Sequence, residues 1–253
     1  MKFRPNLVAV LFLASATGVT AGVIRNYADE QAAIALEERN NALTLAAAPP
    51  YEPHRWNTEQ VQKNNNCYAY AADDIDTVEY GAMPGKRTLN QDPPYLGDTY
   101  WEWQKRLIRG AIADGMIYTG DKPAAKPGYY RVVLLMHPDH RYGLPYHHWL
   151  RQGPDGYWSG KDGPTPATDR DRDGRRIANP EQANLGFPGM RGRPVGYFLV
   201  PHGGLDVGNP NEPKTHAATR AAWQAPPPSP PQMESETIVV TAKRHKPPAP
   251  SGA

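Results

Sequence analysis

The sequence predicts an α+β domain in which helices come first and an antiparallel sheet follows. Stretches with helix-like composition lie before residue 116, and β-prone stretches lie after residue 128. Two of the β-prone stretches are joined by Gly153-Pro154-Asp155-Gly156, which is strong turn chemistry and predicts a hairpin. Helices followed by neighbouring strands are typical of α+β domains.

The first residues are typical of a secretory signal peptide. Lys2 and Arg4 form a basic region, Leu7 to Ala16 are apolar, and Val19-Thr20-Ala21 resembles a cleavage site. The apolar stretch is shorter than the roughly 20 residues that span a bilayer. Residues 1–21 are therefore predicted to direct export, with an N-terminal anchor helix as the alternative.

Helix-like composition continues beyond the predicted signal. Ala28 to Leu45 contain neither Gly nor Pro, which favours a helix, and Ala48-Pro49-Pro50 ends it. Residues 22–55 are thus predicted to be a helical segment with a linker, with a possible role as a propeptide left open. Residues 56–205, dense in aromatic side chains, are the predicted globular domain.

Two helices and four strands are predicted inside this domain. The helices are Cys67 to Asp74, which follows an asparagine N-cap, and Thr99 to Gly115, which has one apolar side. The predicted strands are residues 129–136, 146–152, 157–161 and 195–200. The first of these is apolar over most of its length, so we expect both of its faces to be buried.

Residues 206–253 are predicted to be a disordered, Pro-rich tail that holds ten of the 28 prolines. Within it, residues 236–242 resemble the TonB box of outer-membrane receptors, which adds as a strand to a sheet edge in TonB. Ile238-Val239-Val240 would make that contact, and a chance β-prone tail is the alternative. The resemblance implies a Gram-negative envelope protein, periplasmic or secreted.

The charge pattern indicates neither a nucleic-acid partner nor a zinc site. The formal net charge is only +2, and no histidine, cysteine and carboxylate set has zinc spacing. Asp169, Asp171 and Asp173 begin a D-x-D-x-D-G pattern similar to a calcium loop. The acid expected at the twelfth loop position is replaced by Pro180, so a solvated turn is the alternative.

Cys67 is the single cysteine of the chain. An exported protein with one thiol cannot form an internal disulfide, so the thiol is inert, intermolecular or reactive. The predicted helix start favours a reactive thiol, because free N–H groups and the helix dipole stabilise a thiolate. A small buried hydrophobe is the alternative interpretation.

The predicted strand 146–152 supplies a possible base. Alternation places Tyr146, His148 and Leu150 on one face, which we expect to be the core side, so His148 is the first candidate and His147 the second. If the hairpin has no bulge, Gln152 pairs with Tyr157. Candidates to orient the imidazole then follow from this register.

The predicted register sets His148 opposite Lys161 and Leu150 opposite Ser159. Ser159 could then accept a hydrogen bond from the imidazole. Lys161 cannot accept one and is expected to contact substrate or structure. Asp162 and Asp169 are further carboxylate candidates.

Two segments resemble a group of largely uncharacterised bacterial proteins. The segments are Asn65-Asn66-Cys67-Tyr68-Ala69-Tyr70-Ala71 and residues 147–161, HHWLRQGPDGYWSGK. The patterns of the group are N-C-Y-x-Y-A and H-W-[YL]-R-Q-x-x-[DN]-G-Y-W-S-x-K. The order, a cysteine on a helix and then a histidine on a strand, is similar to the papain-like superfamily, including NlpC/P60 and CHAP amidases.

The resemblance, which covers about residues 64–200, implies a papain-like cysteine hydrolase that cleaves an amide bond, with peptidoglycan peptides as the suggested substrate. Cys67 would be the nucleophile and His148 the base, with Ser159 as the orienting candidate. The Cys67 backbone N–H, with an asparagine or Gln62 side chain, would stabilise the oxyanion. No Asn or His directly follows the histidine strand, so the third position departs from the papain-like pattern.

Two other functions remain open from the sequence. One is a non-catalytic envelope protein that binds a partner or a cell-wall component, with its tail docked on a TonB-type protein. The other is an exported toxin or effector with the same domain.

Overall fold

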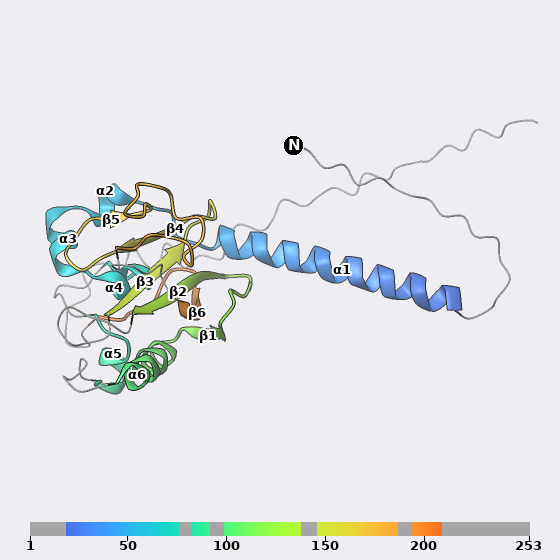
Figure 1. Ribbon diagram of the computed structural model, residues 1–253, viewed down its shortest axis with the longest axis horizontal. Coiled ribbons are helices and arrows are strands. Elements are labelled where there is room, and N and C mark those ends of the chain that lie inside the picture. Colours follow the sequence, from blue (N-terminus) through green and yellow to red (C-terminus); the bar gives the residue numbers. More distant parts are fainter. Residues whose placement is uncertain (1–18, 76–81, 92–98, 138–145, 187–193, 209–253) are drawn as a thin grey trace, which may run out of the picture.

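A computed structural model describes residues 19–75, 82–91, 99–137, 146–186 and 194–208 (Figure 1). Most of the predicted signal peptide lies outside these residues. So do nearly all of the predicted Pro-rich tail and the TonB-like segment 236–242.

Six strands form one antiparallel sheet in the order β1-β6-β2-β3-β4-β5. Their bounds are β1 Ile117–Gly120, β2 Tyr129–His137, β3 Tyr146–Gln152, β4 Trp158–Lys161, β5 Ala167–Thr168 and β6 Pro194–Pro201. Every neighbouring pair is antiparallel. The α+β prediction is therefore confirmed, while the papain-like fold is finer than this architecture shows.

The helices precede the sheet in the chain, as the sequence predicts. They are α1 Val19–Ala46, α2 Pro53–Trp56, α3 Glu59–Asn64, α4 Cys67–Ala71, α5 Lys86–Leu89 and α6 Tyr100–Ala113. Helix α4 is shorter than predicted, because the chain turns at Asp73, where φ is 56°. Helix α6 begins with a capping box between Thr99 and Glu102, which satisfies two of its free N–H groups.

Both faces of the sheet are covered, and alternation assigns each side chain to one of them. On the helix face, Val132, Leu134, Trp149 and Phe198 pack with residues of α4 and α6. On the opposite face, which we call the cleft face, Val133, Leu135, Leu150, Trp158 and Tyr197 pack with Ile177 and Ala183 of the segment after β5. The prediction that β2 is buried on both faces is confirmed.

The predicted hairpin register is wrong by one residue. Gln152 pairs with Trp158, Arg151 with Ser159, and Leu150 with Gly160. The loop takes Tyr157 as an extra residue, because Gly156 has a φ of 82° and the Gly153 N–H donates to the Tyr157 carbonyl. Each β4 side chain therefore lies on the face opposite to the predicted one.

Arg151 fastens α4 to the sheet. Its guanidinium is buried and donates to the Tyr70 carbonyl (3.0 Å) and to the Asp73 carboxylate (2.6 Å). It also lies 4.1 Å from the centre of the Tyr70 ring, and the Tyr70 hydroxyl is 2.7 Å from the Ser159 hydroxyl. Residues of the two sequence motifs thus form one packed unit.

Lys161 fastens the segment before α4. Its ammonium donates to the carbonyls of Gln62, Asn65 and Gly163, each at 2.6 Å. These three bonds use all of its protons, and burial lowers the pKa of Lys161 to about 8. The structure therefore gives Lys161 the structural role that the sequence left open.

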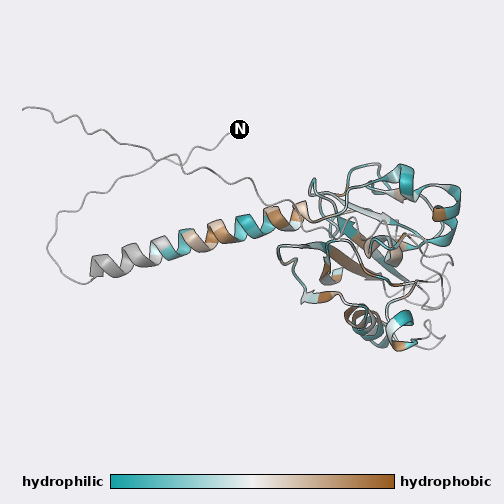
Figure 2. Cartoon of the chain, turned by 180° about the vertical axis from the view of Figure 1, so that it is seen from behind, coloured by the Kyte–Doolittle hydropathy of each residue, from teal (hydrophilic) through white to brown (hydrophobic). Residues whose placement is uncertain are grey.

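Helix α1 projects from the rest of the chain, with only its last turns against the sheet (Figure 1). Thr44, Ala47 and Ala48 are buried there, whereas Ile34 and Leu36 are exposed. Polar and apolar residues alternate along the projecting part (Figure 2). Among the described residues, no helix has the length and apolar character needed to cross a membrane.

Replacing the buried guanidinium should destabilise the domain strongly. We expect Arg151→Met to lower the free energy of unfolding by about 3–5 kcal/mol, because the Asp73 carboxylate loses its buried partner. Urea denaturation followed by tryptophan fluorescence measures this change. The matched control is Arg176→Met, which removes exposed ion pairs to Asp155 and Asp169 and should change stability little. Equal losses for the two variants would contradict the role of Arg151.

Candidate functional site

Cys67 is the first residue of α4, where the sequence predicts it. The Asn66 side-chain oxygen caps the helix by accepting from the Tyr68 and Ala69 N–H groups, each at 3.1 Å. Cys67 is half-buried and packs at the edge of the core on the helix face. The predicted N-cap and helix start at Cys67 are therefore confirmed.

The thiol is not activated in this state. Burial raises the pKa of Cys67 to about 12, and the Asp162 carboxylate adds to the rise. The backbone N–H groups of Trp149, Cys67 and Tyr68 act in the opposite direction but do not overcome burial. The sulfur therefore carries its proton at neutral pH.

His148 is buried on the cleft face of β3. Its Nδ1 has no hydrogen-bond partner among the described residues. A Cβ at residue 160 would lie 2.9 Å from its Nε2, so Gly160 provides the space in which the ring lies. Burial lowers the pKa of His148, with the Asp162 carboxylate opposing the shift, so we expect a neutral imidazole at pH 7.

The Cys67 thiol lies at the backbone of β3, at the peptide bond that joins His148 to Trp149. The Cys67 sulfur interacts with the backbone N–H of Trp149, and that nitrogen is bonded to the carbonyl carbon of His148. Pairing between β3 and β4 ends at Leu150 and Gly160, one residue after Trp149 in β3. The sulfur therefore reaches β3 at Trp149 on the helix face, whereas the His148 ring lies in the cleft on the opposite face.

His147, the second candidate, points to the other face. Its ring packs edge-on against Trp103 of α6, with centroids 5.4 Å apart. Its strand partner is Met136, which belongs to the core on the helix face. The two histidines therefore have different surroundings, although they adjoin in sequence.

Ser159 does not orient His148, which corrects the prediction. The register places Ser159 on the helix face, where its hydroxyl bonds Tyr70, while His148 lies on the cleft face. Asp169 accepts a hydrogen bond from Arg176 at 2.8 Å and does not line the cleft that contains His148. Asp162 alone among the proposed orienters lines the same cleft as His148.

The side chains proposed for the oxyanion site already have other partners. Asn66 donates to the Ala82 carbonyl at 2.7 Å, Asn65 to the Ile75 carbonyl at 3.4 Å, and Gln62 to the Pro164 carbonyl at 3.2 Å. Each therefore holds a loop in this structure. The Cys67 backbone N–H is the candidate donor that these bonds leave in place.

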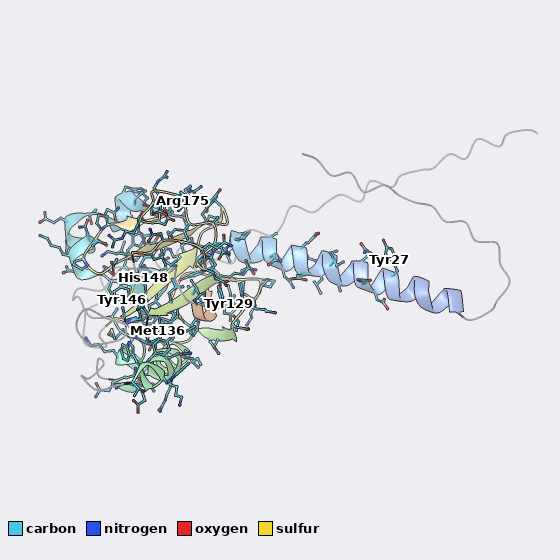
Figure 3. All side chains as sticks on the ribbon, viewed as in Figure 1. Tyr27, Tyr129, Met136, Tyr146, His148 and Arg175 are labelled. Atoms are coloured by element: carbon cyan, nitrogen blue, oxygen red, sulfur yellow. The ribbon has the colours of Figure 1, made fainter. Side chains whose placement is uncertain are left out.

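A cleft of about 310 Å³ opens beside His148. Figure 3 shows His148 and Tyr146 at the same end of the sheet, where their rings stack with centroids 6.5 Å apart. The Tyr146 hydroxyl donates to Asp162 at 2.5 Å. The remaining lining residues are Leu150, Gly160, Thr165, Thr168, Arg170, Asp171, Arg172, Ile177, Asn184 and Leu185.

The calcium-like aspartates do not form a metal site in the described part of the chain. No group of three His, Cys, Asp or Glu side chains there is placed to hold a metal ion. Asp171 accepts from the backbone N–H groups of Asp173 and Arg175 at 3.0 and 2.9 Å, which closes a turn. Asp173 pairs with Arg175, and Asp169 with Arg176.

Sequence reasoning missed the cleft itself. Its far wall is the segment 162–186, which has little regular structure and no hydrophobic period to detect. The glycine at 160 was the available signal, because a glycine in a strand indicates close approach of another group. Here the groups that approach are the Leu150 side chain and the His148 ring.

The comparisons assign no family. No family model matches the sequence, and no solved structure matches the chain. Insoluble matrix shell protein 1 of Ruditapes philippinarum is 29% identical over 136 residues, which span 54% of this chain and 81% of that protein.

The raised pKa predicts how the free thiol reacts. We expect carbamidomethylation of Cys67 by iodoacetamide to be slow at pH 7 and to accelerate about tenfold per pH unit up to pH 10, because only the thiolate reacts. Mass spectrometry of quenched samples gives the rate. In urea the same chain should instead level off above about pH 8.5. A plateau below pH 8 in the folded protein would contradict the raised pKa.

Proposed function

We propose that this chain is an exported cysteine hydrolase of papain-like fold that cleaves an amide bond, with Cys67 as nucleophile and His148 as base. The observation that supports it is the interaction of the Cys67 thiol with the backbone N–H of Trp149, the residue that follows His148, whose buried Nδ1 has no hydrogen-bond partner among the described residues. A cleft large enough for part of a peptide opens at that imidazole.

The resting pair would be uncharged. Because burial raises the pKa of the thiol and lowers that of His148, transfer of the proton would accompany attack on bound substrate. A bound substrate covers the site and supplies a carbonyl carbon to the sulfur. The reaction would thus depend on substrate binding.

The proposed reaction has two stages, formation of a thioester and its hydrolysis. The S–H proton passes to His148 while the sulfur bonds to the amide carbon, and the Cys67 backbone N–H stabilises the oxyanion. His148 then gives the proton to the leaving amine as the C–N bond breaks, which leaves a thioester. Water, deprotonated by His148, attacks the thioester, and the products are a carboxylic acid and the restored thiol.

The substrate class follows from export rather than from the cleft. A hydrolase sent to the envelope of a Gram-negative cell meets the peptides of peptidoglycan, so these are the proposed substrates. The proposed TonB-type contact through Ile238-Val239-Val240 would hold the enzyme near the envelope.

A non-catalytic envelope binding protein is the second candidate. Two observations favour it: the protonated state of the thiol at neutral pH, and the similarity to a protein named for an insoluble shell matrix. In that case the cleft beside His148 would bind a component of the envelope without cleaving it.

Hydrolysis of purified sacculi or muropeptides tests the proposal. We expect the wild-type protein to release new amino groups, Cys67→Ala to release none, and His148→Gln to be slower by about 100-fold or more, because it loses general-base catalysis. Liquid chromatography with mass spectrometry identifies the products.

The matched control is His147→Gln, which changes the neighbouring histidine on the helix face and should leave the rate near that of wild type. Circular dichroism confirms that each variant is folded. Intact muropeptides with folded wild-type protein would remove the proposed substrate. A rate that depends on His147 instead of His148 would overturn the assigned base.

A further inference from the structure

We infer that the cleft beside His148 binds a carboxylate group of the substrate, with Arg172 as its main partner, so that the preferred substrate is an acidic peptide. This inference rests on the proposed function for its substrate role, while the binding site itself stands on the geometry of the cleft. Three features of the lining carry it: the placement of Arg172, the internal partners of the acids, and the position of His148.

Arg172 lies at the rim of the cleft, and its guanidinium occupies space that a glycine leaves open. The guanidinium lies against the backbone of Gly186, where a Cβ would approach Arg172 Nε to 2.6 Å. Its nearest carboxylate is Asp162, at 3.9 Å, which is longer than a hydrogen bond. The side chain is 65% exposed, so its N–H donors can meet a ligand.

The acids of the cleft are occupied by the protein itself. Asp162 accepts from the Tyr146 hydroxyl, and Asp171 accepts from backbone N–H groups of its own turn. Those N–H groups lower the pKa of Asp171, so it remains a satisfied anion. The cationic donors in the lining belong to Arg170 and Arg172.

Arg170 adds a second cation. One of its nitrogens donates to the Gly174 carbonyl at 2.7 Å, which fixes the side chain within its turn. A guanidinium has five donors, so this bond leaves others free. A guanidinium favours a planar, bidentate acceptor, and a carboxylate is the peptide group with that geometry.

Binding at Arg172 would also act on His148. The positive charge of Arg172 contributes to lowering the pKa of the imidazole. A carboxylate on Arg172 offsets that charge and makes His148 a stronger base when substrate is present. Recognition and proton transfer would then be coupled across one cleft.

A binding experiment tests the site without hydrolysis. The full chain with Cys67→Ala is titrated with the α-amides of N-acetyl-L-glutamate and of N-acetyl-L-glutamine, and backbone amide shifts are followed by NMR. We expect the glutamate compound to bind at least about tenfold more tightly, because only its side chain is charged. Arg172→Gln in the same background should weaken glutamate binding by about tenfold or more.

The control is Arg175→Gln, which changes an exposed arginine outside the cleft lining and should leave binding as it is. Equal affinity for the two compounds, or loss of binding in the control alone, would overturn the inference. Intact muropeptides together with selective glutamate binding would remove the proposed peptidoglycan substrate and keep the site. Hydrolysis whose KM does not rise in Arg172→Gln would keep the hydrolase and refute the site.

Discussion

One buried cation organises the domain: the guanidinium of Arg151. It joins the end of α4 to β3 through the Tyr70 carbonyl and the Asp73 carboxylate, and it stacks on the Tyr70 ring. A buried charge is tolerated only with partners of this quality, so each side constrains the other. Because α4 begins with Cys67, the position of the thiol follows from this contact. Lys161 completes the arrangement by holding the Asn65 carbonyl just before the helix.

The side chains on the two faces of β3 have different partners. On the face toward α4, Trp149 packs in the core and Arg151 holds the helix by a hydrogen bond. His148 faces the other way, into the cleft, and its buried Nδ1 lacks a hydrogen-bond partner among the described residues. The Cys67 sulfur interacts with this strand at the backbone N–H of Trp149.

The sequence predicted the elements better than their partners. The bounds of β3 are as predicted, and β2, β6 and α6 differ by one or two residues, because their hydrophobic periods are long enough to detect. The hairpin register failed because Gly156 takes a positive φ and adds Tyr157 to the loop, and one extra residue moves Ser159 to the other face. Helices α2, α3 and α5 are too short to show a period. The cleft depends on the irregular segment after β4, whose contacts no local pattern encodes.

Two glycines determine what the cleft can do. Gly160 leaves room for the His148 ring and Gly186 for the Arg172 guanidinium, and in each case a Cβ would come within 3.0 Å of the functional nitrogen. A side chain at either position would displace the group rather than remove it. The proposed base, His148, and the proposed substrate anchor, Arg172, thus each lie in space that a glycine leaves open. Under the proposed function, Gly160 and Gly186 would therefore decide whether a substrate carboxylate and the imidazole can meet in the same cleft.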